Sequence, residues 1–508
     1  MALSRFLTVG LMGLGLAIAS ATPALADWHQ VTTPKFIVYG EGGARAVVQE
    51  AEELERLDQL MRRTLNITSE REAPRLKVFL VRNRTELAKI STFVDRQVGG
   101  YYSQSPFGVH AALIRGEGNH VLFHEYAHHF MYQYFPSHYP GWFTEGFAEY
   151  FATANVDKAS KVTMGYFSPS RMYALNQMRW VGMDVLLSAK PRDLTGPQRS
   201  TYYAQSWLLT HYIVTDPARL RAFAGYVEAL RTGTGWQEAL QTHFGLTPEQ
   251  LRSELRRYLN GQMRYAEISL ERETIPSQVV TLPKTSDDFV FTYAALQSYI
   301  PQERAEELLA ETRTKASLYP DDPMALFTLG NLEQVWGDND KAEAALNRLL
   351  EIEPDHAEGL RVMAQLRIEQ AEDSETPEGS FSLLNQAQRL LAKAIERDPT
   401  DFRSYRQIAL IRSRAANYPT DNDIDILITA LSLSPQVTNL RMQTVDALNR
   451  KGMTDEAEVL LRVLQNQPHA AGEGPSTPTE EEAQEEQDAE EKTSEDEQPT
   501  PPQDEPDQ

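Results

Sequence analysis

The sequence predicts an α+β domain, with a small mixed sheet and several helices, followed by an all-α solenoid and a disordered acidic tail. Three observations predict this order. Apolar residues form strand-like runs and helical patterns up to about Gly261. Prolines and small residues then recur at intervals close to 34 residues. The last forty residues, 469–508, hold fifteen Asp and Glu residues against one lysine, Lys492.

Composition excludes several classes of protein. The chain of 508 residues has a formal net charge of −23, and this acidic excess argues against a nucleic-acid binder, which needs a basic face. It has no cysteine, so thiol catalysis, disulfides and cysteine-ligated metal sites are excluded. Segment 469–508 has no aromatic residue. It has too little apolar surface to offset its ordering entropy, and we expect it to be disordered.

The N-terminus has the features of a secretory signal peptide. Arg5 precedes an apolar stretch, Phe6 to Ser20, and Ala24-Leu25-Ala26 forms a small-residue cleavage site. The apolar stretch is shorter than the about twenty residues of a bilayer span. We therefore expect residues 1–26 to be a signal peptide, with an uncleaved N-terminal anchor as the alternative. An acidic, cysteine-free exported chain fits a bacterial periplasmic or secreted protein with no membrane span after signal removal.

The first domain, expected over residues 27–265, is built from short strands and longer helices. Alternating or β-rich runs after Pro34 and Pro74 predict strands, and Asn83 is a suitable N-cap for a short helix. The next helices carry apolar residues at helical spacing. The strands are expected at Lys35–Tyr39, Leu76–Leu80 and Phe107–Ile114, and the helices at Ala44–Leu65, Asn83–Ile90 and Val121–Phe135.

The second half repeats. Pro320 and Pro354 are 34 residues apart, and small residues recur with the same period at Gly330 and Ala364. An insertion of 11 residues displaces the next unit. This pattern resembles the tetratricopeptide repeat, expected over 287–468 after a linker at 266–286. The resemblance implies a concave groove for a protein or peptide partner; a structural extension that stabilises the first domain is the alternative.

The densest group of chemically active residues is His124-Glu125-Tyr126-Ala127-His128. Six of the eleven histidines lie between His110 and His138. His124 and His128 are four residues apart, so a helix places both imidazoles on one face, where they can share a zinc ion. Glu125 beside the ion can take a proton from water. His129 points elsewhere on the helix and is expected to be packed.

A catalytic zinc needs a third protein ligand and an open position. Glu145 and Glu149 lie four residues apart in the apparent helix from Gly141 to Tyr150, among aromatic side chains. Two carboxylates in such surroundings are costly to bury without partners. A metal ion, or a hydrogen bond to a metal-binding histidine, removes that cost. Residue pattern alone leaves both glutamates as candidate ligands.

The His-Glu-x-x-His motif followed by Trp142-x-x-Glu145-Gly146-Phe147-Ala148 resembles the gluzincin metallopeptidases, in particular their peptidase MA-like bacterial branch. The resemblance implies a zincin-like fold and makes Glu145 the third zinc ligand, with His124 and His128. It implies that Glu149 lies next to the ligands and supports one of them without binding the zinc. Sixteen residues separate His128 from Glu145, fewer than in the aminopeptidase branch, so Glu149 stays the weaker alternative ligand.

The same resemblance implies two further parts of the site. A substrate-binding edge strand is expected above the zinc, and Phe107–Ile114 is the candidate, with an ordinary edge strand as the alternative. A Tyr or His on a later helix is expected to stabilise the oxyanion. Tyr203 is the first choice and Tyr202 the next; packing beneath the zinc helices is the alternative for both.

Together these features predict an exported zinc-dependent endopeptidase that hydrolyses protein or peptide substrates. Glu125 and Tyr203 are its expected catalytic residues, Zn²⁺ its cofactor, and the repeats its means of recruiting a substrate or protein partner. The layout is similar to that of metalloproteases of envelope protein quality control that carry such repeats. The gluzincin aminopeptidases carry an acidic Gly-x-Met-Glu-Asn segment, which is absent here. A non-catalytic periplasmic repeat adaptor, with a structural or silent zinc domain, is the alternative function.

Overall fold

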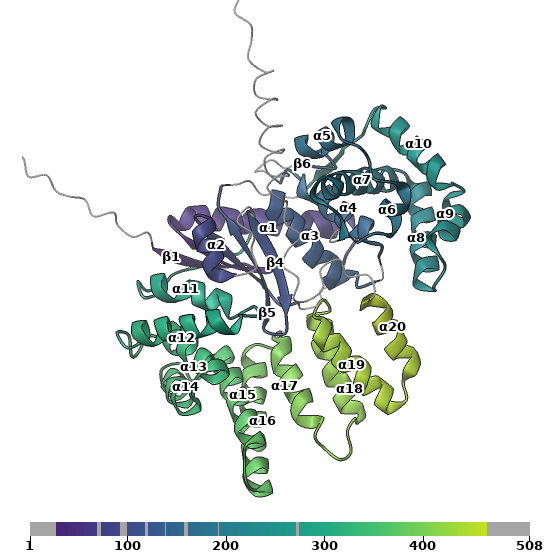
Figure 1. The fold of residues 1–508 in the computed structure, drawn as a ribbon. Coiled ribbons are helices and arrows are strands. Elements are labelled where there is room, and N and C mark those ends of the chain that lie inside the picture. The colour runs from purple at the N-terminus through teal and green to yellow at the C-terminus, as the bar shows by residue number, and fades with distance from the viewer. Residues whose placement is uncertain are drawn as a thin grey trace, which may run out of the picture.

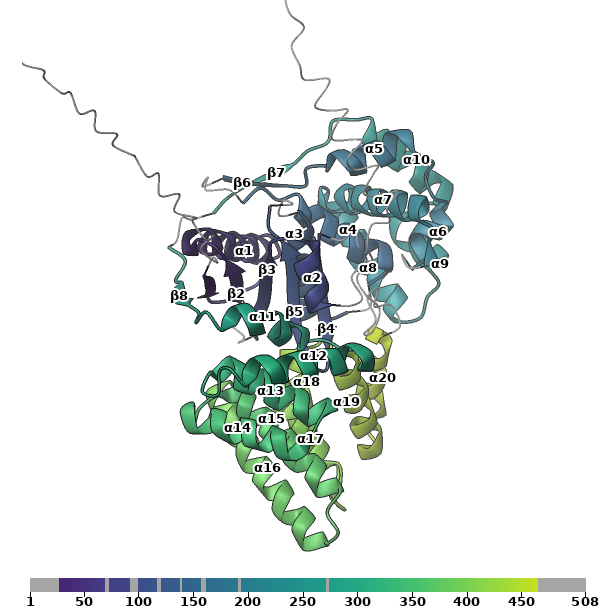
Figure 2. The ribbon, with the colours of Figure 1, turned by 60° about the vertical axis from the view of Figure 1, so that its left-hand side comes forward.

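The computed structural model describes residues 27–68, 73–91, 99–116, 120–137, 139–156, 161–190, 193–270 and 274–464. The predicted signal peptide and acidic tail lie outside these residues. A small sheet occupies the centre, a group of helices lies to one side of it, and an arc of helices lies beneath it (Figure 1). A second view shows the same three parts, with the arc below the sheet (Figure 2).

The described residues form a mixed six-stranded sheet in the order β4-β5-β3-β2-β1-β8. Strands β2, β3 and β5 are parallel to one another, whereas β1, β4 and β8 pair antiparallel with their neighbours. Apolar side chains of β3 are buried on both faces, as in strands covered on two sides. The strands are β1 (Trp28–Thr32), β2 (Phe36–Glu41), β3 (Leu76–Val81), β4 (Gly100–Ser105), β5 (Gly108–Ile114) and β8 (Gln278–Thr281).

One face of the sheet is covered by α1 (Ala44–Thr64) and α3 (His120–Tyr134). The apolar residues of α1 recur at helical spacing, so Leu54, Leu57 and Met61 are fully buried in the core that includes this face. Both helices were predicted from their spacing, and the structure confirms them. The short helix α2 (Arg84–Ile90) is confirmed as well, because Asn83 Oδ1 accepts a hydrogen bond of 3.1 Å from the Glu86 amide.

The opposite face of the sheet packs on the repeat half of the chain. Tyr39, Phe79 and Tyr101 of the sheet share one hydrophobic core with Tyr293 and Phe327 of the arc. The rings of Phe79 and Tyr293 lie 6.1 Å apart, edge to face. The arc therefore covers the second face of the sheet and shares a hydrophobic core with it.

Among the described residues, the seven helices α4 to α10 follow α3 and form the group of helices beside the sheet. α4 and α7 approach closely at Gly146, where a β-carbon would lie 2.3 Å from the Ser206 carbonyl oxygen. Only glycine permits this helix contact. These helices are α4 (Gly141–Ala152), α5 (Pro169–Gln177), α6 (Met183–Ser188), α7 (Gly196–Val214), α8 (Pro217–Arg231), α9 (Trp236–Phe244) and α10 (Pro248–Leu259), and a small sheet joins β6 (Lys161–Met164) to β7 (Ala266–Ser269).

The arc consists of helical pairs, in agreement with the predicted repeats. In α13, a β-carbon at Gly330 would lie 2.7 Å from Leu346 Cγ of α14, which explains the small residue at this position. Most of the predicted insertion lengthens α16, which has 21 residues against 14 in α14. The described helices of the arc are α11 (Ser286–Ala295), α12 (Gln302–Ala316), α13 (Pro323–Trp336), α14 (Asn339–Ile352), α15 (Ala357–Glu372), α16 (Pro377–Arg397), α17 (Phe402–Arg412), α18 (Asp421–Leu433), α19 (Thr438–Lys451) and α20 (Thr454–Leu464).

Two expectations about the first domain were wrong. Segment 266–286 is not a linker, because it contains β7 and β8, and β8 completes the large sheet beside β1. The strand within Phe107–Ile114 is not at an edge, because β5 lies between β4 and β3. Among the described residues, β4 is the edge strand on the side of α3. None of the described helices combines the length and apolar composition that a bilayer span requires.

Candidate metal centre

Helix α3 brings His124 and His128 together. The two residues are one helical turn apart, so their Nε2 atoms lie 3.1 Å from each other. His128 is fully buried, whereas His124 keeps 12% of its side chain exposed. This pair therefore has one buried member and one that reaches toward solvent.

Helix α4 adds the third residue of the group. Glu145 Oε2 lies 3.5 Å from His124 Nε2 and 3.4 Å from His128 Nε2. Glu145 is fully buried at the contact of α3 and α4. The structure thus brings together the three predicted ligands, and they form a group of metal-binding type among the described residues.

The dimensions of this group fit a zinc ion. A tetrahedral zinc with bonds of about 2.0–2.1 Å spaces its ligand atoms about 3.3 Å apart. The three separations of 3.1, 3.4 and 3.5 Å are close to this value. Two neutral imidazoles and one carboxylate also supply the donor types that zinc prefers, and three protein ligands leave one position open.

Glu149 lies on the outer side of His124. Its Oε1 is 3.2 Å from His124 Nδ1, the ring nitrogen that does not face Glu145 Oε2 and His128. Arg171 of α5 binds both carboxylate oxygens of Glu149 at 3.0 Å. This arrangement holds the His124 ring with Nε2 toward the group, which is the role expected for Glu149 as the support of a ligand.

The buried charges shift the pKa values of these residues. Burial alone would lower the pKa of His124, but hydrogen bonds with Glu145 and Glu149 raise it to about 10. Burial would raise the pKa of Glu149, but Arg171 and His124 hold it well below the ordinary value of 4.5. His124 and Glu149 thus each favour the charged form of the other in this buried group.

The predicted base, Glu125, follows His124 on the same helix. Burial raises its pKa, while the charges of His124 and His128 act in the opposite direction. A raised pKa suits a carboxylate that takes and returns a proton near neutral pH. Tyr102 of β4 lies close enough for the charge of Glu125 to contribute to its raised pKa, after burial as the main cause. Glu125 and Tyr102 of the edge strand thus lie within electrostatic range of each other.

The predicted oxyanion donor, Tyr203, lies on α7 beside the group. Its ring centroid is 6.2 Å from that of His124, in an edge-to-face arrangement, and Arg171 Cζ lies 5.3 Å from its centre. The second choice, Tyr202, donates its hydroxyl to the Ala189 carbonyl oxygen at 3.2 Å. Tyr203 is therefore the better placed of the two candidates.

Sequence reasoning missed three side chains around this group. Arg171 and Tyr102 lie on segments without a motif, and no local pattern pairs them with α3 or α4. Tyr132 stacks on His128 with 6.3 Å between ring centres, and its buried hydroxyl has no hydrogen-bond partner among the described residues. The spacing of four residues from His128 to Tyr132 was the one signal that could have identified it.

The other histidines of the cluster lie outside the group. His129 Nδ1 is 3.1 Å from the Tyr102 hydroxyl, and burial lowers its pKa to about 4. His110 Nε2 is 3.3 Å from the Tyr101 hydroxyl, and burial lowers its pKa to about 3. Both are packed histidines, as expected for His129. His138 is not among the described residues.

Comparisons with known proteins find solved structures that are similar to part of this chain. No protein-family model matches it, and no curated protein does. A tetratricopeptide repeat protein of Thermus thermophilus, TTC0263, is 19% identical, covers 36% of this chain and 92% of its own, and has a TM-score of 0.32. MamA from Desulfovibrio magneticus is 17% identical, with coverage of 36% and 95% and a TM-score of 0.27.

A further MamA structure is 14% identical, covers 37% of this chain and 96% of its own, and has a TM-score of 0.27. The similar structures thus extend over about a third of this chain, and the first of them is a tetratricopeptide repeat protein. The evidence for the repeats is the series of helical pairs in this chain and does not depend on these comparisons.

Proposed function

We propose that this chain is an exported, zinc-dependent endopeptidase of the gluzincin type that hydrolyses peptide bonds in protein substrates. The observation that supports it is the triangle of His124, His128 and Glu145 with Glu125 beside it. A purely structural zinc site closes all four positions with protein ligands. Three ligands and an adjacent carboxylate of raised pKa instead match the needs of hydrolysis.

Zinc bound by these three residues would supply a Lewis acid that polarises the scissile carbonyl and acidifies water. Glu125 would accept the proton of the attacking water on its carboxylate and deliver it to the leaving amine. Tyr203 would donate its hydroxyl to the developing oxyanion. Glu149 and Arg171 would keep His124 oriented during these steps.

The sheet edge gives the substrate a place to bind. Strand β4 has β5 on one side and, among the described residues, no strand on the other. An extended peptide could pair with this free edge, next to Glu125 and α3. We further propose that the repeats recruit substrates or a protein partner, and that the enzyme serves envelope protein quality control in a bacterial periplasm.

Metal content tests this proposal without knowledge of the substrate. Elemental mass spectrometry of the mature chain should find about one zinc per chain, lost in His124→Ala. The zinc-loaded protein should cleave fluorescein-labelled casein, and Glu125→Gln should bind zinc but not cleave. A chain that takes up no metal, or a Glu125→Gln variant that cleaves like the wild type, would overturn the proposal.

A second candidate function is a non-catalytic repeat adaptor. The observation that favours it is the exposure of Phe381, a residue near the start of α16 that is 68% exposed. An exposed aromatic side chain on a repeat helix is a typical anchor for a protein partner. A phenotype that survives Glu125→Gln but is lost in Phe381→Ser would favour the adaptor.

A further inference from the structure

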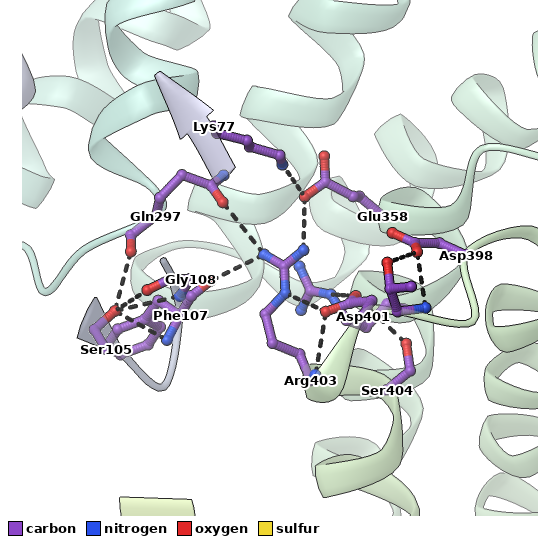
Figure 3. Close-up of polar contacts among 12 residues, drawn as sticks. Lys77, Ser105, Phe107, Gly108, Gln297, Glu358, Asp398, Asp401, Arg403 and Ser404 are labelled. Atoms are coloured by element: carbon purple, nitrogen blue, oxygen red, sulfur yellow. Dashed lines mark hydrogen bonds and ion pairs between the residues drawn. The ribbon is translucent and has the colours of Figure 1, made fainter. Parts of the chain in front are cut away.

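The hairpin between β4 and β5 is held by the repeat half of the chain. Ser105 Oγ, at the end of β4, donates to the Gln297 carbonyl oxygen at 3.0 Å. Arg403 Nη1, from α17, donates to the Phe107 carbonyl oxygen at 2.9 Å. Figure 3 shows the guanidinium of Arg403 between the hairpin and the repeat helices. The repeats thus bind the backbone of the turn itself.

The contact is close as well as polar. A β-carbon at Gly108 would lie 2.8 Å from Gln297 Oε1 and 3.3 Å from the Gln297 carbonyl oxygen. Ser103 Oγ lies 3.1 Å from Ser298 Oγ, so the contact continues along β4. The hairpin therefore packs against the segment that follows α11.

Arg403 is fixed by partners from three segments of the chain. Its Nε lies 2.7 Å from Asp401 Oδ1, and its Nη2 lies 2.9 Å from Glu358 Oε1 of α15. The same oxygen of Glu358 lies 3.0 Å from Lys77 Nζ of β3. Buried ion pairs contribute little net stability but impose a defined geometry. This network joins the sheet to two repeats at one point (Figure 3).

The middle of β4 contacts helix α3, which carries His124 and His128. The Tyr102 hydroxyl lies 3.1 Å from His129 Nδ1 of α3, one residue beyond His128. Strand β4 is thus held by α3 on one side and by the repeats at its hairpin. Any shift of the hairpin changes the position of the free edge relative to the zinc-binding helix.

We infer that Arg403 is a positioning residue: by binding the Phe107 carbonyl oxygen, it lets the repeat half set the position of the β4 edge on which the substrate lies. This inference rests on the proposed endopeptidase function. It assigns Arg403 of α17 to the protein's own hairpin and leaves the rest of the repeat surface for a partner. Arg403 acts on substrate binding through β4 and touches no reacting atom.

The test compares Arg403→Gln and Arg403→Lys in the full mature chain, with Arg348→Gln as a matched control. Arg348 forms exposed ion pairs with Asp321 and Glu351 and does not contact the hairpin. A cavity of about 1060 Å³ is lined in part by Arg403, Glu358 and Asp401. Glutamine or lysine at position 403 therefore fits without a steric clash. Circular dichroism and metal content verify that each variant folds.

Hydrogen exchange of residues 100–114 is the first measurement, because it needs no catalysis. Arg403→Gln should speed exchange in the hairpin about tenfold, as for a lost charge-assisted hydrogen bond. Arg403→Lys should lie between this variant and the wild type, and Arg348→Gln should match the wild type. Unchanged exchange in Arg403→Gln would overturn the inference whatever the enzyme does.

Kinetics on a quenched fluorescent peptide is the second measurement. Arg403→Gln should raise KM severalfold while kcat stays within about twofold, because ground-state positioning is lost. Gly108→Ala, which displaces the hairpin from its own side, should give the same pattern. A loosened hairpin with unchanged KM would overturn the positioning role, whereas failure of the proposed function appears separately, as a wild-type protein without zinc or cleavage.

Discussion

Arg171 binds both oxygens of Glu149 at 3.0 Å, although the two residues lie 22 positions apart on different helices. Glu149 in turn contacts Nδ1 of His124 at 3.2 Å. The positive charge of Arg171 makes it possible to bury this carboxylate almost completely, at 1% exposure. The orientation of a predicted metal ligand therefore depends on an arginine outside every recognised motif.

Replacing Arg171 by methionine should weaken zinc binding about 10–100-fold, because Glu149 loses its partner and His124 its fixed orientation. Competition with a zinc-specific chelator measures this change. Arg231→Met is the matched control, since Arg231 pairs with Glu228 on the exposed surface. Equal zinc affinity in the two variants would contradict the orienting role of Glu149.

Glu125→Gln should retain zinc, because the side chain is not among the three grouped ligands. The rate of peptide hydrolysis should fall about 10²–10⁴-fold, the usual contribution of a general base. Steady-state kinetics on the zinc-loaded variant, with metal content determined on the same sample, checks both statements. Loss of zinc from this variant would show that Glu125 takes part in metal binding instead.

Tyr203→Phe should lower kcat about 10²–10³-fold if its hydroxyl stabilises the oxyanion, with KM little changed. Tyr202→Phe is the control, because that hydroxyl donates to the Ala189 carbonyl oxygen. Kinetic constants of both variants give the comparison. If kcat falls in Tyr132→Phe while Tyr203→Phe stays fully active, the oxyanion donor is the Tyr132 hydroxyl instead.

Acidification should weaken the contact between sheet and repeats. Burial alone would raise the pKa of Glu358, but Lys77 and Arg403 hold it well below the ordinary value of 4.5. The unfolded chain binds this proton at a higher pH than the folded chain does. The network therefore contributes stability above about pH 4.5, which is lost as the pH falls through the folded pKa.

Glu358→Gln should flatten this dependence. Urea unfolding between about pH 6 and pH 3 gives the slope of the unfolding free energy for both proteins. The slope, and not the level at neutral pH, is compared, because the variant also leaves Lys77 and Arg403 with one acidic partner fewer. Parallel slopes would mean that Glu358 has the same pKa in both states.

Gly146→Ala should destabilise the protein by about 1–3 kcal/mol or prevent folding, because the new methyl group meets the Ser206 carbonyl oxygen at 2.3 Å. Thermal unfolding measures the loss. Gly43→Ala is the matched control, since nothing lies within 4 Å of its β-carbon position, and it should change stability by less than about 1 kcal/mol. A stable Gly146→Ala variant would contradict the close packing of α4 on α7.

The sequence predicted those parts of the fold that depend on local periodicity. The spacing of Leu54, Leu57 and Met61 predicted α1, and the proline period predicted the helical pairs of the repeats. Strand β4 was missed because Ser103, Gln104 and Ser105 are polar and follow a glycine pair, a composition that indicates a turn. Strand β8 was missed because it is short and its side chains are exposed.

The candidate site divides in the same way. His124 and His128 could be predicted as a pair, because helical spacing alone places them on one face. Choosing Glu145 as the third ligand required the resemblance to the gluzincins, because the residue pattern alone left Glu145 and Glu149 both as candidates. The link from Arg171 to Glu149 and the link from Arg403 to the hairpin join segments far apart in sequence. Such contacts depend on tertiary packing and leave no periodic trace.

The shared core of sheet and repeats has a consequence for how the chain matures. Strand β8 and helix α11, which complete and cover the sheet, come after residue 277. A chain shortened before them would expose Tyr39, Phe79 and Tyr101 and leave β1 as an unprotected edge, prone to aggregation. The half of the chain that carries His124, His128 and Glu145 therefore reaches its final form only after the C-terminal half has been synthesised.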